Sequence, residues 1–510
     1  MILLSAFLLF QVQPVISKAI LPWFGGSPAV WTTCMLFFQV LLLGGYAYAH
    51  WLTSRPAAFQ QAVIHVVVLG LAILLLPIVP GESWKPTGSE HPTTRILLLL
   101  GVCVGLPYFA LSSTGPLVQA WFSKVCPERS PYWLYALSNV GSLGALLSYP
   151  FVFEPMMSTR AQGLSWSAGF AVFAIACGGL AMTAWRGGIE QRELSVGKVR
   201  PDGASDGANA TDLPPVADRL SWLGLPALAS VFLLAVTNHL CQDVAVVPFM
   251  WVAPLSLYLL SFIFVFAGSR WYSRTWHGLA AAAALAGVAC LQLEFEITQF
   301  ITNRGWVPTL EVWEQRAYGW MDALHVRWVM VSINLDGLSL HSLNECIVVH
   351  ASTYLAALFF VCMVCHGEMV RRRPASKWLT SFYMMTSAGG ALGGIIVALI
   401  CPAVFKTYLE LNWAMTASYA LLLFTLGTQL ANRWKKSTTR RTKAVAVAAS
   451  LVMSLVVACA GFIVGAQVES FDTDDLATAR SFYGVLHVEE ANQQSDVWRG
   501  RELMNGRILH

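Results

Sequence analysis

Four polar side chains that could bind a solute or a proton crowd into six residues of an otherwise apolar stretch: Asn238, His239, Gln242 and Asp243. At helical spacing His239, Gln242 and Asp243 share one face. An ionised aspartate in hydrocarbon costs about 2.5–3.5 kcal/mol on insertion scales, so Asp243 should lie at a membrane interface or face a wet or paired interior. Two interpretations stay open: a polar helix end at the outer interface, or a cation or proton-coupled site in which His239 titrates near neutral pH.

The N-terminal apolar stretch carries a second polar group, formed by Gln11, Gln13 and Lys18 around Pro14. Proline in a helix interior frees a backbone carbonyl and kinks the helix. The glutamine side chains can then satisfy that break or face a solute pathway. For Lys18 we expect a side chain that snorkels to the interface, with solute binding as the alternative.

Two further polar residues, Asn139 and Glu154, lie within and directly after the uncharged stretch 130–153. Glu154 is expected at the interface, and Asn139 is a further candidate for the pathway. The predicted solute-binding residues are therefore Gln11, Lys18, Asn139, Asn238, His239, Gln242 and Asp243.

Small residues at four-residue spacing occur in two stretches of the chain, as Gly389 and Gly393, Gly390 and Gly394, and Gly144 and Ser148. Small residues at this spacing let helix backbones approach closely, which predicts tight helix packing, and a mobile gate lined by these helices is the alternative. The glycines concerned are Gly141, Gly144, Gly389, Gly390, Gly393 and Gly394.

Motifs of catalysis and cofactor binding are missing from the sequence. Residues 362–366 (Cys-Met-Val-Cys-His) fit a haem-attachment pattern, but they precede three arginines that predict a cytoplasmic position, and attachment needs the outer side. There is no second Cys/His pair nearby for zinc, no Walker A motif and no nucleophile elbow. We expect no catalytic residue, metal, cofactor or nucleic-acid partner in this chain, and expect His366 and Glu368 to organise the basic loop that follows.

The composition indicates whether water or lipid surrounds the helices that carry these residues. The chain has 510 residues, of which 56% are hydrophobic and 12% charged, and its net charge is +4. Its mean hydropathy is +0.58. A soluble domain carries about 25% charged residues, so an ordinary cytosolic enzyme, a disordered chain and a nucleic-acid binder are excluded. The main partner of this chain is expected to be the lipid bilayer.

Long uncharged runs predict an all-α polytopic membrane protein with about 13 transmembrane helices. About 20 apolar residues cross a bilayer, and these runs are continuous rather than alternating. Apart from the N-terminal stretch 1–17, they are 19–54, 56–81, 96–123, 130–153, 161–185, 220–242, 244–269, 275–293, 346–367, 378–405, 411–432 and 444–468.

Basic residues predict the orientation of these helices. The loops after even-numbered helices hold 20 of the 32 lysines and arginines, whereas the loops after odd-numbered helices hold 8 and the tail holds 4. Because cytoplasmic loops are enriched in basic residues, we expect a cytoplasmic N-terminus and an outer-face tail.

The domain organisation follows from a linker and a short internal repeat. Residues 138–145 match 387–394, and each match precedes a Pro-x-x-Phe sequence, which predicts the parallel 6+6 arrangement of major-facilitator-type transporters. The predicted parts are a first six-helix bundle (1–185), a flexible cytoplasmic linker (186–219), a second bundle (220–432) with an outer-face insert (294–345), one additional helix (444–466) and a tail (467–510).

The tail is rich in β-forming residues. A strand is expected over 481–488, and a hairpin with Asn505 and Gly506 at its turn is expected from 498 onward. About 44 residues build no stable core of their own, so we expect the tail to be the start of a soluble domain that is incomplete here.

Several segments resemble bacterial membrane proteins fused to a spermidine-synthase-like domain, the fused major-facilitator-type/spermidine synthase-like family. They are the opening 9–39 (from LeuPheGlnValGlnPro), the runs 237–258 and 366–394, and 480–486 (ArgSerPheTyrGlyValLeu). The resemblance implies a multi-helix half in the bacterial inner (plasma) membrane and, in full-length relatives, an aminopropyltransferase-like half. Its Gly-rich cofactor loop would lie beyond residue 510, so no catalytic residue is carried over to this chain.

Two functions are therefore expected as alternatives. The first is a transporter-like protein for a small polar or cationic metabolite, linked to polyamine metabolism. The second is a non-transporting membrane anchor of a spermidine-synthase-like enzyme, with no enzymatic activity of this chain itself.

Overall fold

The computed structural model describes residues 1–25, 27–54, 57–86, 91–125, 132–196, 213–243, 248–292, 347–375, 378–436, 475–491, 500–505 and 508–509. These residues divide into two compact units. The first unit holds residues 1–272, 365–414 and 474–510, and the second holds 273–364 and 415–473.

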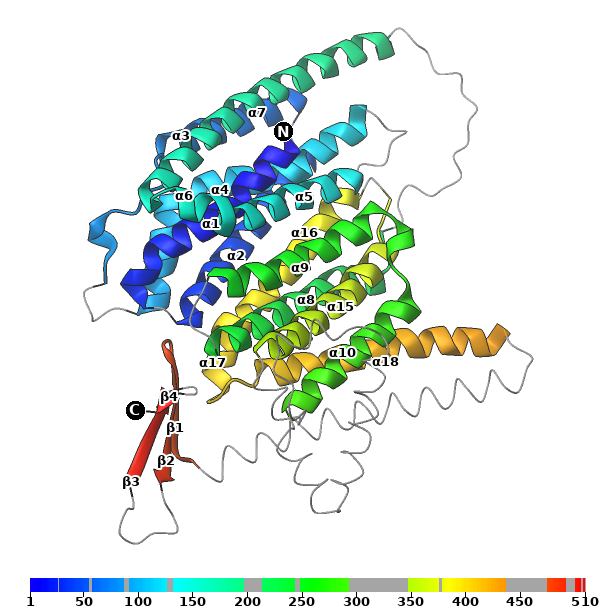
Figure 1. The fold of residues 1–510 in the computed structure, drawn as a ribbon. Helices are drawn as coiled ribbons and strands as arrows, with labels where there is room; N and C mark the ends of the chain where they lie inside the picture. Colours follow the sequence, from blue (N-terminus) through cyan, green and yellow to red (C-terminus); the bar gives the residue numbers. More distant parts are fainter. Residues whose placement is uncertain are drawn as a thin grey trace, which may run out of the picture. The chain divides into compact units, whose positions relative to one another are not determined.

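Helices make up nearly all of the described chain, and a small sheet follows them (Figure 1). The principal helices are α1 (Ile2–Phe24), α2 (Pro28–Ser54), α3 (Ala58–Leu74), α4 (Pro92–Val125), α5 (Tyr132–Ser148), α6 (Glu154–Met156), α7 (Thr159–Val196), α8 (Val216–Asp243), α9 (Pro248–Ala267), α10 (Arg274–Gln292), α15 (Ile347–Arg371), α16 (Leu379–Ile395), α17 (Cys401–Val404) and α18 (Glu410–Lys436).

Ten of the helices in the described part are long and apolar enough to cross a membrane, and two shorter apolar helices, Phe59–Leu74 and Trp251–Ala267, accompany them. Large apolar side chains such as Leu74, Val172 and Ile175 are exposed on the outside of α3 and α7, where a soluble protein would carry polar groups. The protein is a multi-pass integral membrane protein.

The helices agree with the uncharged runs in position, although the expected count of thirteen spans is not established. Twelve of the thirteen predicted stretches coincide with helices, and the predicted additional helix 444–466 and the insert 294–345 lie outside the described residues. The predicted linker 186–219 is helical at both ends, because α7 continues to Val196 through good helix formers and α8 begins at Val216. The middle of that linker, 197–212, also lies outside the described residues.

Two helices of the first unit share one succession of elements. The 17 residues of α5 continue into a five-residue π-helix, Tyr149–Phe153, and then into the short α6. The 17 residues of α16 continue into a five-residue π-helix, Ile396–Ile400, and then into the short α17. π-helical turns are rare and concentrate at functional sites, so their repetition at corresponding places is informative.

Packing in the first unit pairs these two helices in equivalent ways. α5 lies along α1, and α16 lies along α8 (Figure 1). In addition, α5 packs against α9, and α16 packs against α2. Each of the two helices therefore contacts one partner from its own half of the sequence and one from the other half.

The tail forms a four-stranded antiparallel sheet in the order β1 (Asp475–Ser481), β2 (Gly484–Ala491), β3 (Gly500–Asn505) and β4 (Ile508–Leu509). The predicted strand 481–488 is corrected by this sheet, because Ser481 pairs with Gly484 and the chain turns at Phe482 and Tyr483. The hairpin predicted from 498 onward agrees with the antiparallel pairing of β3 and β4, but Asn505, which was predicted at its turn, pairs with Ile508 as a strand residue, and Gly506 lies outside the described residues.

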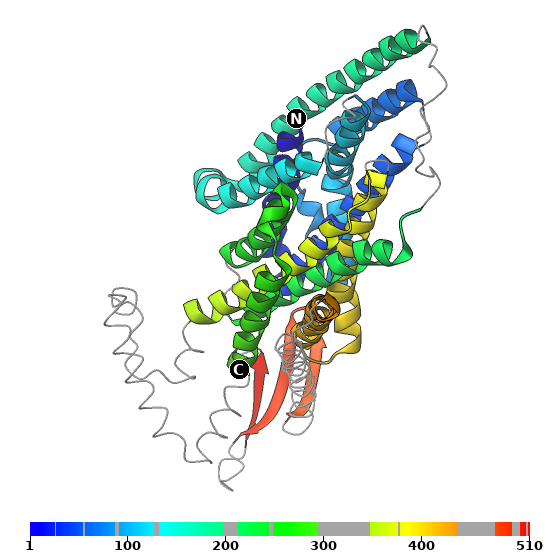
Figure 2. The same ribbon diagram turned by 90° about the vertical axis from the view of Figure 1, so that its right-hand side faces the viewer.

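The strands lie at one end of the helices of the first unit (Figures 1 and 2), and the β1–β2 turn is their part nearest to the helices in Figure 1. We call this the hairpin end of the unit. There α1 ends at Phe24, α2 begins at Pro28 and α17 ends at Val404. The opposite end is where α2 ends at Ser54 and α16 begins at Leu379.

The second unit is held together by contacts among α10, α15 and α18. The amide of Gln429 donates a hydrogen bond of 2.9 Å to the hydroxyl of Thr275. Gly278 faces the side chain of Leu426, and Gly287 faces Thr353, so small residues of α10 permit close packing within this unit as well.

Candidate functional site

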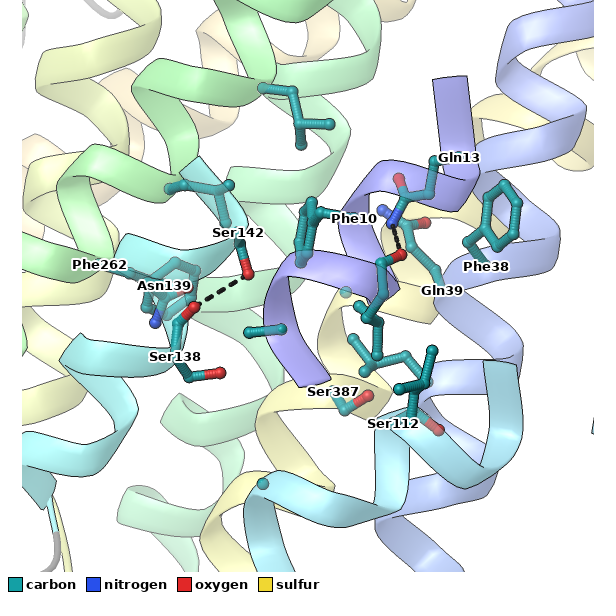
Figure 3. Close-up of a pocket in the computed structure, with 18 of the residues that line it drawn as sticks. Phe10, Gln13, Phe38, Gln39, Ser112, Ser138, Asn139, Ser142, Phe262 and Ser387 are labelled. Atoms are coloured by element: carbon teal, nitrogen blue, oxygen red, sulfur yellow. Dashed lines mark hydrogen bonds between the residues drawn. The ribbon is translucent and has the colours of Figure 1, made fainter. Parts of the chain in front are cut away.

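A cavity lies among seven helices of the first unit, α1, α2, α4, α5, α8, α9 and α16 (Figure 3). It encloses about 1030 Å³, including the part that is open to solvent. Its polar lining consists of Ser5, Gln13, Gln39, Ser112, Ser138, Asn139, Ser142, Thr386 and Ser387, together with tyrosine hydroxyls.

Aromatic rings form much of the remaining wall. No lysine, arginine, aspartate or glutamate occurs among the described residues that line the cavity. Hydroxyls and amides can bind neutral polar groups, and aromatic faces attract a cation within about 6 Å. The cavity therefore suits a neutral polar solute or a single cationic group, and it offers no countercharge to an anion. The rings are those of Phe10, Phe38, Tyr46, Tyr108, Tyr135, Tyr258 and Phe262.

Three buried polar atoms of this lining lack a hydrogen-bond partner among the described residues: Gln13 Oε1, Gln39 Oε1 and Ser387 Oγ. The opposite atoms of the two glutamines are held, since Gln13 Nε2 donates to the hydroxyl of Tyr108 at 3.4 Å and Gln39 Nε2 donates to Ser230 at 3.0 Å. Buried polar groups are normally hydrogen-bonded, so these atoms are suited to a polar solute or to water (Figure 3).

Toward the hairpin end, beyond the cavity, side chains from both halves of the sequence meet. The hydroxyl of Thr32 on α2 donates to Oδ1 of Asn238 on α8 at 2.8 Å. The rings of Trp31, which precedes Thr32 on α2, and of Trp251 on α9 stack at a centroid distance of 4.0 Å. We call these four residues the hairpin-end closure.

Toward the opposite end, aromatic rings from the two halves of the sequence meet. Tyr135 on α5 stacks on Tyr383 of α16 at 4.8 Å, and Tyr46 on α2 meets Tyr383 edge-on at 6.5 Å. Nearby, Nδ1 of His50 lies 2.8 Å from the hydroxyl of Thr380. We call these residues the opposite-end closure.

The structure separates the predicted solute-binding residues. Asn139 lines the cavity, and its Nδ2 donates to the Tyr135 carbonyl of its own helix at 2.8 Å. Asn238 belongs to the hairpin-end closure, and His239 is half-buried beside it on α8. Gln11 is buried on α1 but is not among the residues that line the cavity. Gln242 and Asp243 form the last turn of α8, and their side chains lie outside the described part.

Gln39 and Ser387 were missed by sequence reasoning, and Gln13 was noted but not chosen. They lie in three apolar helices that are far apart in the sequence. Only the packing of α1, α2 and α16 brings the three together, so no local pattern of residues marks them as one site.

Lys18 and Glu154 form an ion pair. Lys18 Nζ lies 2.5 Å from Glu154 Oε1, between α1 and α6. Their side chains are 37% and 23% exposed, so the pair is partly accessible to solvent or headgroups. Neither of them lines the cavity, although Lys18 borders a small separate pocket with Trp23 and Arg160.

Breaking the Lys18–Glu154 pair should have little effect. We expect Lys18→Gln to lower the free energy of unfolding by no more than about 1 kcal/mol, because partly exposed ion pairs are screened and contribute about 0.2–1 kcal/mol. The measurement is thermal unfolding of the detergent-purified chain followed by tryptophan fluorescence. A loss similar to that from removing a buried charge partner would contradict this assignment.

The six glycines that were predicted to pack helices tightly differ in the atoms that lie close to them. A Cβ atom on Gly141 would lie 2.6 Å from the Leu3 carbonyl of α1, and one on Gly389 would lie 2.2 Å from the Leu223 carbonyl of α8. Gly393 faces Ala227 and Ser230 of α8, and Gly394 faces the side chain of Gln39. Gly144 and Gly390 have no described atom within 4 Å of such a Cβ.

His366 and Glu368 lie behind the cavity wall. His366 is fully buried, its Nδ1 is 2.8 Å from the Ser261 hydroxyl, and its ring stacks on Phe262 at 3.7 Å. Glu368 accepts a hydrogen bond of 2.9 Å from the hydroxyl of Tyr272. Within the described residues no three His, Cys, Asp or Glu side chains gather in a way that would hold a metal ion.

Comparison with protein-family models and with curated proteins found no match to this chain.

Proposed function

We propose that the protein is a transporter that moves a small polar solute, neutral or singly cationic, through the central cavity by alternating access. The observation that carries the proposal is the cavity itself, which has polar, uncharged walls within the membrane-embedded unit. It lies between the hairpin-end closure and the opposite-end closure. Polar groups inside a membrane protein are costly and mark solute pathways.

Both closures join elements from different halves of the sequence, and this supports alternation. Thr32 and Trp31 belong to the first half, whereas Asn238 and Trp251 belong to the second. Tyr135 and Tyr383 are divided in the same way. A rocking motion of one half against the other would open one closure while the other stays shut.

A parallel 6+6 repeat related to major-facilitator transporters remains part of the proposal. It is supported by the shared succession of helix, π-helix and short helix in α5 and α16. It is also supported by the reciprocal packing of α5 on α9 and of α16 on α2. In such a repeat each half supplies one helix to the central seam in an equivalent position.

The side chains that line the central cavity limit the class of solute that it can bind. Neutral hydroxyl and amide groups with tyrosine faces would bind a polyol, a zwitterion or a single ammonium group. A polyamine carries several ammonium groups, and the described lining offers them no carboxylate. The cavity therefore supports a neutral or monocationic solute better than spermidine.

The resemblance to fused transporter/spermidine synthase-like proteins supports a second candidate, a non-transporting anchor. The attachment of the tail to the helices favours the anchor. Arg480 of β1 pairs with Glu410 at the start of α18, and their side chains are 7% and 4% exposed. A sheet fixed in this way would hold a following domain at the membrane. We further infer a plasma-membrane location with a cytoplasmic N-terminus from the distribution of basic residues.

Uptake by the full chain in proteoliposomes separates the two candidates. The probes are radiolabelled choline, mannitol, spermidine and sulfate. We expect saturable uptake of choline or mannitol and none of sulfate. If purified, folded protein takes up none of the four solutes, the transporter proposal fails and the anchor is favoured.

Asn139→Leu and Gln13→Leu are each expected to reduce that uptake by about tenfold or more, because losing one hydrogen bond to a buried polar group costs about 1.4 kcal/mol or more. Val140→Leu is the matched control, since Val140 is the next residue on α5 and is 46% exposed. Equal uptake by the Asn139→Leu and Val140→Leu variants would exclude the cavity as the pathway.

A further inference from the structure

The β1–β2 hairpin is held to the second half of the sequence by one buried arginine. The guanidinium of Arg480 forms an ion pair with Glu410, donates to the Thr407 carbonyl at 2.7 Å and lies 4.5 Å above the ring centre of Tyr408. All three partners lie at the beginning of α18 or in the loop before it. Three contacts on one desolvated charge make a specific attachment.

The turn of the same hairpin contacts the first half of the sequence. The hydroxyl of Ser27, between α1 and α2, donates to the Phe482 carbonyl at 3.3 Å. The Phe482 ring packs against the hydrophobic core formed by α1, α2, α3, α4 and α7. A Cβ atom on Gly25 would lie 3.5 Å from the ring of Tyr483. The turn therefore bridges the two halves at the hairpin end.

A second cavity, which we call the vestibule, lies directly under this bridge. Arg480, Ser481 and Phe482 of the hairpin line it on one side, and Thr32 and Asn238 line it on the other. Thr32 and Asn238 also form the hairpin-end closure. Gln39, in the central cavity, is seven residues further along α2, which is about 10 Å at 1.5 Å per residue.

The order along these helices is therefore central cavity, hairpin-end closure, vestibule and hairpin turn. The π-helical residues Val397, Ala398 and Leu399 of the second half also line the vestibule. A solute that enters the vestibule meets the hairpin residues that line it, and separation of the halves at this end would break one of the two attachments of the turn.

We propose that the β1–β2 turn is a clasp that holds the hairpin end of the transporter closed, and that it opens by releasing Phe482 and Ser27 while Arg480 stays on Glu410. The inference rests on the proposed alternating-access function. The direction of release follows from the two attachments. Arg480 makes a buried charged contact with three partners, whereas the other side depends on one long hydrogen bond and one partly buried ring. The weaker attachment breaks first.

The clasp is tested by the accessibility of the central cavity from the hairpin end. A reporter cysteine, Ser142→Cys, is placed in the cavity wall of the full chain in liposomes. A membrane-impermeant, cationic methanethiosulfonate is then added from the hairpin side, and the labelling rate is corrected for the chain that lacks the reporter. Phe482→Ala is expected to raise this rate about tenfold, as a weakened closed state becomes less populated.

A milder variant and a control accompany it. Phe482→Leu should give a smaller increase in the same direction, which keeps the test informative if the alanine variant does not fold. Leu503→Ser on β3 should leave the rate unchanged, because Leu503 is exposed and pairs with Val488 within the sheet, away from the turn. An unchanged labelling rate in both Phe482 variants would overturn the clasp.

The same experiment distinguishes a failure of the clasp proposal from a failure of the transport proposal. If the Phe482 variants label faster but the chain carries no solute, the hairpin does close this end and the proposed transport is wrong. If the chain carries solute while the labelling rate is insensitive to Phe482, transport stands and the clasp is wrong.

Discussion

Gly389→Ala is expected to destabilise the protein by about 3 kcal/mol, the upper end of the cost of inserting one carbon into a packed interior. The added Cβ would lie 2.2 Å from the Leu223 carbonyl and 3.1 Å from the Ala227 amide nitrogen of α8. Both are backbone atoms, so no side chain can rotate away and α16 has to move from α8. The measurement is the thermal unfolding midpoint of the purified chain in detergent.

Gly390→Ala provides the matched control on the same helix, one residue further along. No described atom lies within 4 Å of a Cβ at this position. Alanine has a higher helix propensity than glycine, by about 1 kcal/mol, so the midpoint should stay level or rise. Equal midpoint shifts in the two variants would contradict the close approach of α16 and α8.

Glu410→Leu is expected to have the second large effect, because it leaves the charge of Arg480 without its partner in a buried place. Removing one member of a buried ion pair costs about 3–5 kcal/mol. The hairpin can avoid part of this cost by detaching from the start of α18. We therefore expect both a lower unfolding midpoint and faster proteolysis within 475–491. The two readouts are measured on the same protein preparation.

The double variant Arg480→Met/Glu410→Leu separates the charge effect from lost packing. Replacing a buried pair by apolar residues of similar volume is often neutral or stabilising. We therefore expect the double variant to recover most of the stability that Glu410→Leu loses. If Arg480→Met adds a further loss instead, the pair does not act as a unit in the folded protein.

The helical, membrane-embedded character of the chain could be predicted because it depends on local composition. Uncharged runs such as 96–123 and 220–242 exceed the thickness of a bilayer, and helices occupy them. The site was predicted less well. Asn139 was chosen and lines the cavity, whereas the ion pair of Lys18 with Glu154, which is 136 residues away, was not predicted. A salt bridge over that separation leaves no local signal.

The sequence alone determined that the protein is built for a membrane, which stretches are long and apolar enough to cross it and that the tail differs in kind, because hydropathy and β-propensity are properties of neighbouring residues. Tertiary structure alone decided which polar groups face one another. Gln13, Gln39 and Ser387 belong to three separate helices, and they share a cavity only because those helices pack around it. Arg480 likewise finds Glu410 through the fold, since a buried charge needs a partner and only three-dimensional packing determines which one it meets.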